Sequence, residues 1–168
     1  VLTRESTSDS PVLKSISKVI SAQSVATVET IELIAAVANR WAAHPFDVIR
    51  SAIPPRVASV NKEAWTDNPV SKSRSKTNRS YIHIPPAVDR FEFMKSTIER
   101  SLDKGSTLVV VPDNRAVQRL ASLIPNAIVL DSALERSERY RNFLKCRYLR
   151  NLVVIGTRSA IFAPIADL

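Results

Sequence analysis

Apolar residues in the first third of this chain recur with the spacing of amphipathic helices. Over residues 27–42 the apolar positions follow the 3.6-residue period, which predicts a helix with one buried face. The predicted inward residues are Ile31, Ile34, Ala35, Ala38, Trp41 and Ala42. His44-Pro45 should end this helix, because the residue before a proline is pushed out of the helical region. Pro45 can then open a short helix over residues 46–52.

An earlier helix is predicted near the start of the chain. Asp9-Ser10-Pro11 combines a capping side chain with a proline in the first turn. The apolar residues that follow share one helical face, and they are Val12, Ile16, Val19 and Ile20. Residues 1–57 are therefore expected to form a small helical segment.

The second half of the chain alternates between helical and strand patterns. Helices are predicted over residues 86–104, 113–124 and from 132 or 133 to about 149, and strands over 107–111, 127–130 and 151–155. Gly105 should stop the first of these helices. This alternation predicts an α/β fold with a parallel sheet and right-handed crossovers, formed by residues 81–168.

The intervening residues 58–80 have the composition of a linker. From Val70 to Ser80 the chain carries four cationic residues among serine, threonine and asparagine, with no acidic residue. Such a segment buries too little apolar surface to offset the entropy lost on ordering. It is either a flexible basic tether for phosphate groups or a solvated linker without specific contacts.

The overall composition indicates a basic protein with a real core. The 168 residues are 45% hydrophobic and carry a formal net charge of +8, with a pI near 10.1. This charge suits a polyanionic partner, most often nucleic acid, although a basic protein without such a partner stays possible. The longest apolar runs are far shorter than the roughly 20 residues of a membrane span, and no signal peptide is visible. We expect a cytoplasmic protein with no membrane partner.

The residue types that support common chemistries are largely missing. The chain has only two glycines, and their spacing excludes both a P-loop and a dinucleotide-binding fingerprint. One cysteine excludes an internal disulfide, and with two histidines it makes a structural zinc site unexpected. Lys145 and Arg147 beside Cys146 would lower its pKa, but a lone helical cysteine is more often a bystander. We predict no catalytic residue, no cofactor and no metal ligand.

The candidate binding residues are cationic and hydroxylic. Thr157-Arg158-Ser159 follows the strand ending near Gly156, at the carboxyl edge where parallel sheets bind ligands. These donors suit phosphate oxygens, and the alternative is a purely structural turn. Arg115, which follows the Val-Pro-Asp turn, is a further candidate residue for binding phosphate. Arg139, Lys145 and Arg147 make the helix over 136–150 either an electropositive flank for nucleic acid or a solvated face.

Several blocks of the sequence occur in the order found in one known family. They are LVVVPD at 108–113, LDSAL at 130–134, SERY at 137–140 and VVIGTRSAIFAP at 153–164. These blocks resemble the first helicase lobe of the primosomal protein N′, or PriA, replication-restart helicase family. The segments RWAAHPFDVI at 40–49 and AIPP at 52–55 resemble the end of that family's amino-terminal DNA-binding domain.

The resemblance implies a partial RecA-like lobe of the P-loop NTPase type. It also implies binding to forked or single-stranded DNA in the nucleoid, and reloading of the replicative helicase with other primosome proteins. Active members have an ATP-binding Gly-Lys-Thr loop before the strand over 107–111, whereas this chain has residues 90–104 there. It is in this respect similar to the actinobacterial members, which lack ATPase motifs.

The resemblance also accounts for what is missing. The family's magnesium motif and zinc-binding cysteines would follow Leu168, its DNA 3′-end pocket would largely precede Val1, and its winged-helix domain is reduced to a linker. We therefore expect an interior piece or a degenerate short form without its own ATPase. Two alternatives remain: a lobe of an active 3′-to-5′ helicase whose nucleotide site lies elsewhere, and a structural module that docks primosome proteins.

Overall fold

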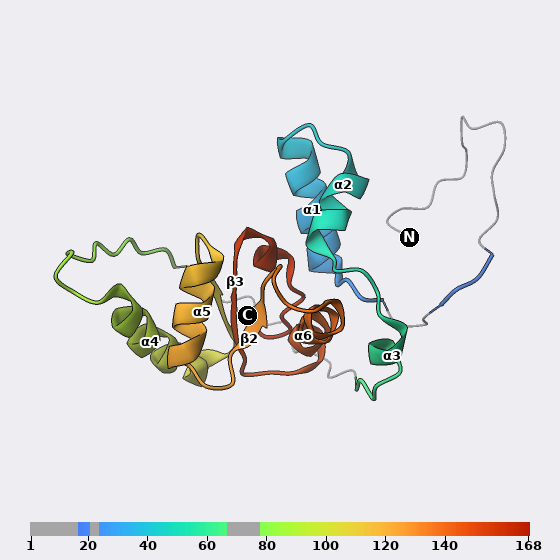
Figure 1. Ribbon diagram of the computed structural model, residues 1–168. Coiled ribbons are helices and arrows are strands. Elements are labelled where there is room, and N and C mark those ends of the chain that lie inside the picture. The colour runs from blue at the N-terminus through green and yellow to red at the C-terminus, as the bar shows by residue number, and fades with distance from the viewer. Residues whose placement is uncertain (1–16, 21–23, 67–77) are drawn as a thin grey trace.

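A computed structural model describes residues 17–20, 24–66 and 78–168 and confirms the predicted α/β fold (Figure 1). Its centre is a parallel sheet with the strand order β1-β3-β2. The strands are β1 (Thr107–Val110), β2 (Ile128–Leu130) and β3 (Val153–Gly156). The arrangement is consistent with a partial RecA-like lobe. Most of the predicted first helix lies outside the described residues, and residues 17–20 are exposed and not helical.

The central strand β3 organises the lobe. Every residue of β3 is buried, because β1 and β2 flank it and helices cover both faces. Its register aligns Ile155 with Val109 of β1 and Val129 of β2. This position explains why β3 is a continuous apolar run rather than an alternating one.

One face of the sheet is covered by α4 (Arg90–Ser101) and α5 (Asn114–Leu123), which lie together in Figure 1. The core on this face consists of Ile98, Val111, Ala116, Val117, Leu120, Ile124, Val153 and Ile155. The predicted helix over 86–104 begins later than expected. The Asp89 carboxylate accepts a hydrogen bond of 2.8 Å from the backbone N–H of Phe91, so Asp89 caps α4. A short 3₁₀ helix, η1 (Leu102–Lys104), follows α4 and ends at Gly105.

The opposite face is covered by α6 (Arg136–Tyr148). Phe143 and Cys146 of α6 pack with Val154 of β3 in the second core cluster. This helix also starts later than predicted. The buried Asp131 carboxylate accepts from the backbone N–H of Ala133 at 2.9 Å and so forms a turn first.

An amino-terminal hairpin packs beside the lobe through the segment after β3. It consists of α1 (Val28–Arg40) and α2 (Pro45–Ala52), as predicted. Its core contains Ile34, Ala38, Val48 and Ala52 together with Phe162, and Phe162 belongs to the 3₁₀ helix η2 (Arg158–Phe162).

Three residues predicted to face inward from α1 are exposed instead. They are Ala35, Trp41 and Ala42. The helix ends at Arg40, earlier than predicted, because Ala42 adopts a left-handed conformation with φ of 49°. The Ala43 N–H then donates to the carbonyl of Ala38 at 2.9 Å, which closes the helix end. Trp41 thus lies 76% exposed at the turn between α1 and α2.

Residues 58–66, which the sequence assigned to the linker, are folded. The short helix α3 (Ala58–Asn61) contacts α6. Val60 is fully buried against aromatic residues of α6, and Trp65 stacks on Tyr148 with 5.5 Å between ring centroids. The prediction of a linker is therefore wrong for residues 58–66. Most of the basic stretch lies outside the described residues.

Gly156 ends β3 at a point where there is no room for a side chain. A Cβ atom at this position would lie 2.6 Å from the Cβ of Ala160 and 2.7 Å from the carbonyl oxygen of Leu130. The second neighbour is backbone of an adjacent strand and cannot rotate away. Close approach, rather than unusual backbone angles, therefore requires glycine here.

We predict that Gly156→Ala lowers the free energy of unfolding by about 1–3 kcal/mol, the usual cost of overpacking a tight site. Urea denaturation followed by circular dichroism measures the change. Ser122→Ala, at an exposed position on α5, serves as the control and should stay within about 0.5 kcal/mol of the parent protein. An unchanged midpoint for Gly156→Ala would contradict this account of the strand end.

Candidate nucleic-acid interface

The loops after β1 and β3 form an open hollow at the carboxyl edge of the sheet. These strands are neighbours, so their following loops meet. The hollow has a volume of about 610 Å³ and is lined by Pro112, Asp113, Asn114, Arg115, Thr157 and Arg158. Three of the residues proposed from the sequence, Arg115, Thr157 and Arg158, are thus brought together.

The hollow presents two guanidinium groups and a hydroxyl. Arg115 and Arg158 are exposed, and within the part of the chain that the structure describes neither forms a hydrogen bond or ion pair. The carboxylate here, Asp113, accepts from the backbone N–H of Ala116 at 2.8 Å and caps α5. Free guanidinium groups with a neighbouring hydroxyl suit phosphate oxygens.

Ser159 occupies a different position from its two neighbours. It is partly buried within η2 and does not line the hollow. The turn itself is held by the N–H of Ala160, which donates to the carbonyl of Thr157 at 2.9 Å. The structural role of this turn and its proposed binding role are therefore compatible.

The basic residues of α6 lie on the other side of the sheet. Arg139, Lys145 and Arg147 are each partly buried, and none lines the hollow. The Arg147 guanidinium lies 5.4 Å from the centroid of the Tyr148 ring. The structure therefore separates the two groups of candidate residues that the sequence proposed.

A further cation of α6 is engaged by the folded segment at 58–66. Arg141 forms a bidentate contact with Glu63, with a shortest distance of 2.8 Å. Hydrogen bonding from Arg141 lowers the pKa of the Glu63 carboxyl. Nearby, the Tyr140 hydroxyl donates to the Asn61 side-chain oxygen at 3.0 Å. The ion pair between Arg141 and Glu63 therefore neutralises part of the positive charge of α6.

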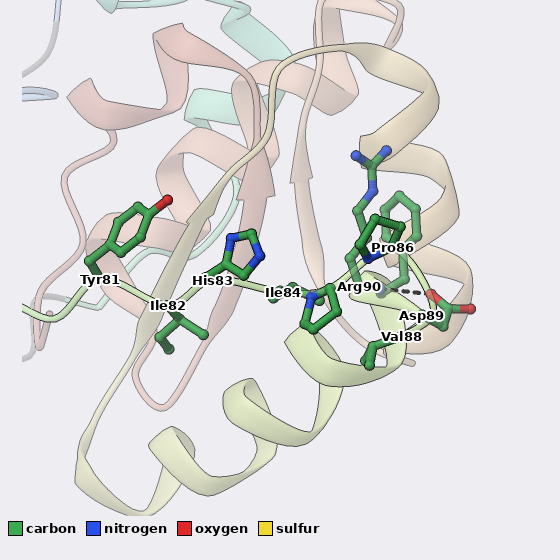
Figure 2. A pocket seen from close by; sticks show the side chains of 10 residues that line it. Tyr81, Ile82, His83, Ile84, Pro86, Val88, Asp89 and Arg90 are labelled. Atoms are coloured by element: carbon green, nitrogen blue, oxygen red, sulfur yellow. Dashed lines mark hydrogen bonds between the residues drawn. The ribbon is translucent and has the colours of Figure 1, made fainter.

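A second hollow, of about 590 Å³, was missed by the sequence analysis. Its lining comes from the segment leading into α4, residues 81–91 (Figure 2). The sequence predicted a helix over 86–104, which includes about half of this segment, so no hollow was expected there. Arg90 belongs to this hollow. Arg119, one helical turn after Arg115, was also missed, although the four-residue spacing alone places both on one face of α5.

The described residues contain no group of three or more metal-ligating side chains of the His, Cys, Asp or Glu type. None of the helices resolved in residues 17–20, 24–66 and 78–168 is long and apolar enough to cross a membrane.

The fold and hollow together define the class of protein, a parallel α/β lobe with a basic carboxyl edge, and this arrangement is consistent with a partial RecA-like lobe. The probable replication restart protein PriA of Mycobacterium leprae is 28% identical over 183 aligned positions, and its counterpart in Mycobacterium tuberculosis is 32% identical. Both alignments cover 90% of this chain and 28% of the relative. The replication restart protein PriA of Treponema pallidum is 31% identical over 94 residues, which are 52% of this chain and 14% of that protein.

The chain belongs to the PriA family of replication restart proteins. It spans about 28% of the length of the mycobacterial relatives. No family model matches the chain, and no solved structure matches it.

Cys146 is buried in the core between α6 and the sheet. Burial raises the pKa of its thiol to about 12, and this effect outweighs the opposing influence of Lys145. The lowered pKa that the neighbouring cations suggested is therefore wrong. The cysteine is a core residue rather than a nucleophile.

We predict that the Cys146 thiol resists a thiol reagent at pH 8 in the folded protein. A group with a pKa near 12 holds very little thiolate at that pH, so it reacts only after unfolding. Absorbance with an aromatic disulfide reagent, measured with and without denaturant, gives both rates. Fast labelling of the folded protein would show that the thiol is accessible and contradict the packing described here.

Proposed function

We propose that this chain binds forked or single-stranded DNA through the hollow at the carboxyl edge of its sheet. The observation that carries the proposal is the convergence of Arg115, Thr157 and Arg158 from two neighbouring loops. Ser159 belongs to the same turn but does not line the hollow. Phosphate contacts of this kind give binding that is independent of base sequence.

The basic residues of α6 have a secondary role in this proposal. Arg139, Lys145 and Arg147 lie away from the hollow, so they contribute long-range attraction rather than contacts to the same stretch of DNA. The net charge of +8 favours association with any polyanion.

The names of the relatives support a role in replication restart. In that role the DNA-bound chain helps reload the replicative helicase together with other primosome proteins, as a nucleoid-associated cytoplasmic protein. Because the chain covers only 28% of those relatives, the proposal assigns it a DNA-positioning part of the process.

We also propose that the chain does not hydrolyse ATP. The hollow before α4 has no glycine or lysine in its lining, and the threonine or serine that would hold magnesium is missing too. At the start of α4 the Asp89 carboxylate accepts the Phe91 N–H, a backbone donor of the kind that a phosphate would use.

The DNA proposal predicts salt-dependent binding of a labelled fork and of a single strand. Each lost phosphate contact should reduce the slope of log affinity against log salt by about 0.7 for single strands. Arg158→Gln is expected to weaken binding and to reduce this slope, as measured by fluorescence anisotropy across a salt series.

Lys104→Gln is the matched control, because Lys104 is an exposed cation before the amino end of β1. It should leave the affinity unchanged. Affinity that does not depend on salt, or no binding near about 50 mM salt, would refute the proposal. Unchanged affinity after Arg158→Glu and Arg139→Glu would instead favour a module that docks primosome proteins.

The absence of ATPase predicts that magnesium and ATP do not stabilise the fold. A ligand present at about 100 times its Kd adds about 2.7 kcal/mol of stability, which thermal denaturation detects as a rise of several degrees. No rise is expected with millimolar ATP and magnesium, nor phosphate release with DNA present. A clear rise in Tm would instead favour a helicase lobe with a working nucleotide site.

A further inference from the structure

Arg119 connects the two hollows. It lies four residues after Arg115 on α5, which places the two Cβ atoms about 5–6 Å apart on one helical face. Its guanidinium is 3.9 Å from the Asp89 carboxylate and 5.9 Å from the centroid of the Phe91 ring. Asp89 and Phe91 both line the hollow before α4. The same face of α5 therefore borders both hollows.

A row of exposed arginines follows this face. We name Arg158, Arg115, Arg119 and Arg90 the arginine stripe. The Arg90 guanidinium lies 4.9 Å from the centroid of the Phe91 ring, which Arg119 also approaches. Four cations thus stand in a continuous row across two hollows.

Two carboxylates face the stripe, and both are engaged as helix caps. Asp113 caps α5, and Asp89 caps α4 while also contacting Arg119. The stripe keeps an excess of two positive charges after both carboxylates are counted. A polyanion is the ligand class that this surface complements.

The hollow that Arg90 lines also carries an exposed aromatic ring, at the start of the segment that leads into α4. This ring belongs to Tyr81, which is 90% exposed. Figure 2 shows Tyr81 and His83 projecting from the same side of the extended segment, with Ile82 on the other side. The prolines at 85 and 86 restrict the backbone that carries these rings. An exposed ring that shares a hollow with a cation can stack on an unpaired base while the cation contacts the backbone phosphates.

We infer that one single strand of nucleic acid lies along the arginine stripe and stacks a base on Tyr81. This inference rests on the proposed DNA binding at Arg115 and Arg158, and it extends that contact to a second, aromatic subsite. Stacking is tolerant of sequence because every base has a flat face. The segment before α4 thus takes a strand of nucleic acid, not a nucleotide.

The test uses the full chain with three fluorescent probes: a 15-residue oligothymidine, an abasic oligonucleotide of the same length, and a blunt duplex. Tyr81→Ala should weaken oligothymidine binding about 5- to 150-fold, the range for loss of one stacked base. Binding of the abasic strand and of the duplex should not change, since neither offers an unpaired base. Tyr81→Phe keeps the ring and should bind oligothymidine as the parent protein does.

Two further variants separate this inference from the proposed function. Arg119→Gln should reduce the salt slope for oligothymidine by about 0.7. Trp41→Ala, at another exposed aromatic on the turn between α1 and α2, is the control and should change nothing. Loss of binding with Arg158→Gln but not with Tyr81→Ala or Arg119→Gln overturns the stripe while keeping the proposed function. No effect of Arg158→Gln overturns the proposed function itself.

Discussion

The placement of β3 between two parallel neighbours is the constraint on which the rest of this structure depends. Its side chains supply both cores, with Ile155 on one face and Val154 on the other. Gly156 lets the chain turn immediately, so that η2 folds back beside the carbonyl of Leu130. The same short helix then carries Arg158 at its start and Phe162 at its end. One strand end therefore determines both where the candidate DNA site lies and where the amino-terminal hairpin packs.

The opposite end of the sheet is closed by hydrogen bonds. Asp167 accepts from the Ser106 hydroxyl and from the backbone N–H of Asn151 at 3.0 Å, and the Ser106 oxygen accepts from the N–H of Leu152 at 2.8 Å. Gly105 lies against the carbonyl of Asp167, where a Cβ would come within 2.6 Å. Because glycine is so scarce in this chain, the sequence excluded a phosphate-binding loop. The two glycines instead stand at close contacts, one at each end of the sheet. Internal hydrogen bonds close one end of the sheet, and the open hollow lies at the other.

The sequence predicted the lobe well because its signals are local. The helix predicted over residues 113–124 forms as α5, with Asp113 as its cap and with Val117 and Leu120 buried. Parallel topology then brought Arg115 and Arg158 together. The starts of α4 and α6 were misplaced because Asp89 and Asp131 make side-chain hydrogen bonds that periodicity does not reveal. Residues 58–66 were misassigned for a different reason: Val60 and Trp65 pack on α6 residues about 80 positions away along the chain.

Positive charge alone did not identify the binding surface. The helix α6 is among the most cationic segments of the sequence, yet Arg141 pairs with Glu63 and Arg147 packs on Tyr148. The α5 helix is less conspicuous, but its arginines lie beside hollows and face carboxylates that already cap helices. A cation with an internal partner has less to gain from a phosphate than one in water beside a hollow, because its Coulomb energy is already partly satisfied. The surface best suited to a polyanion is therefore the hollow at the carboxyl edge, where the described residues leave the Arg115 and Arg158 guanidinium groups without an ion pair. Arg119 and Arg90 extend this surface, although Asp89 and the Phe91 ring already engage them in part.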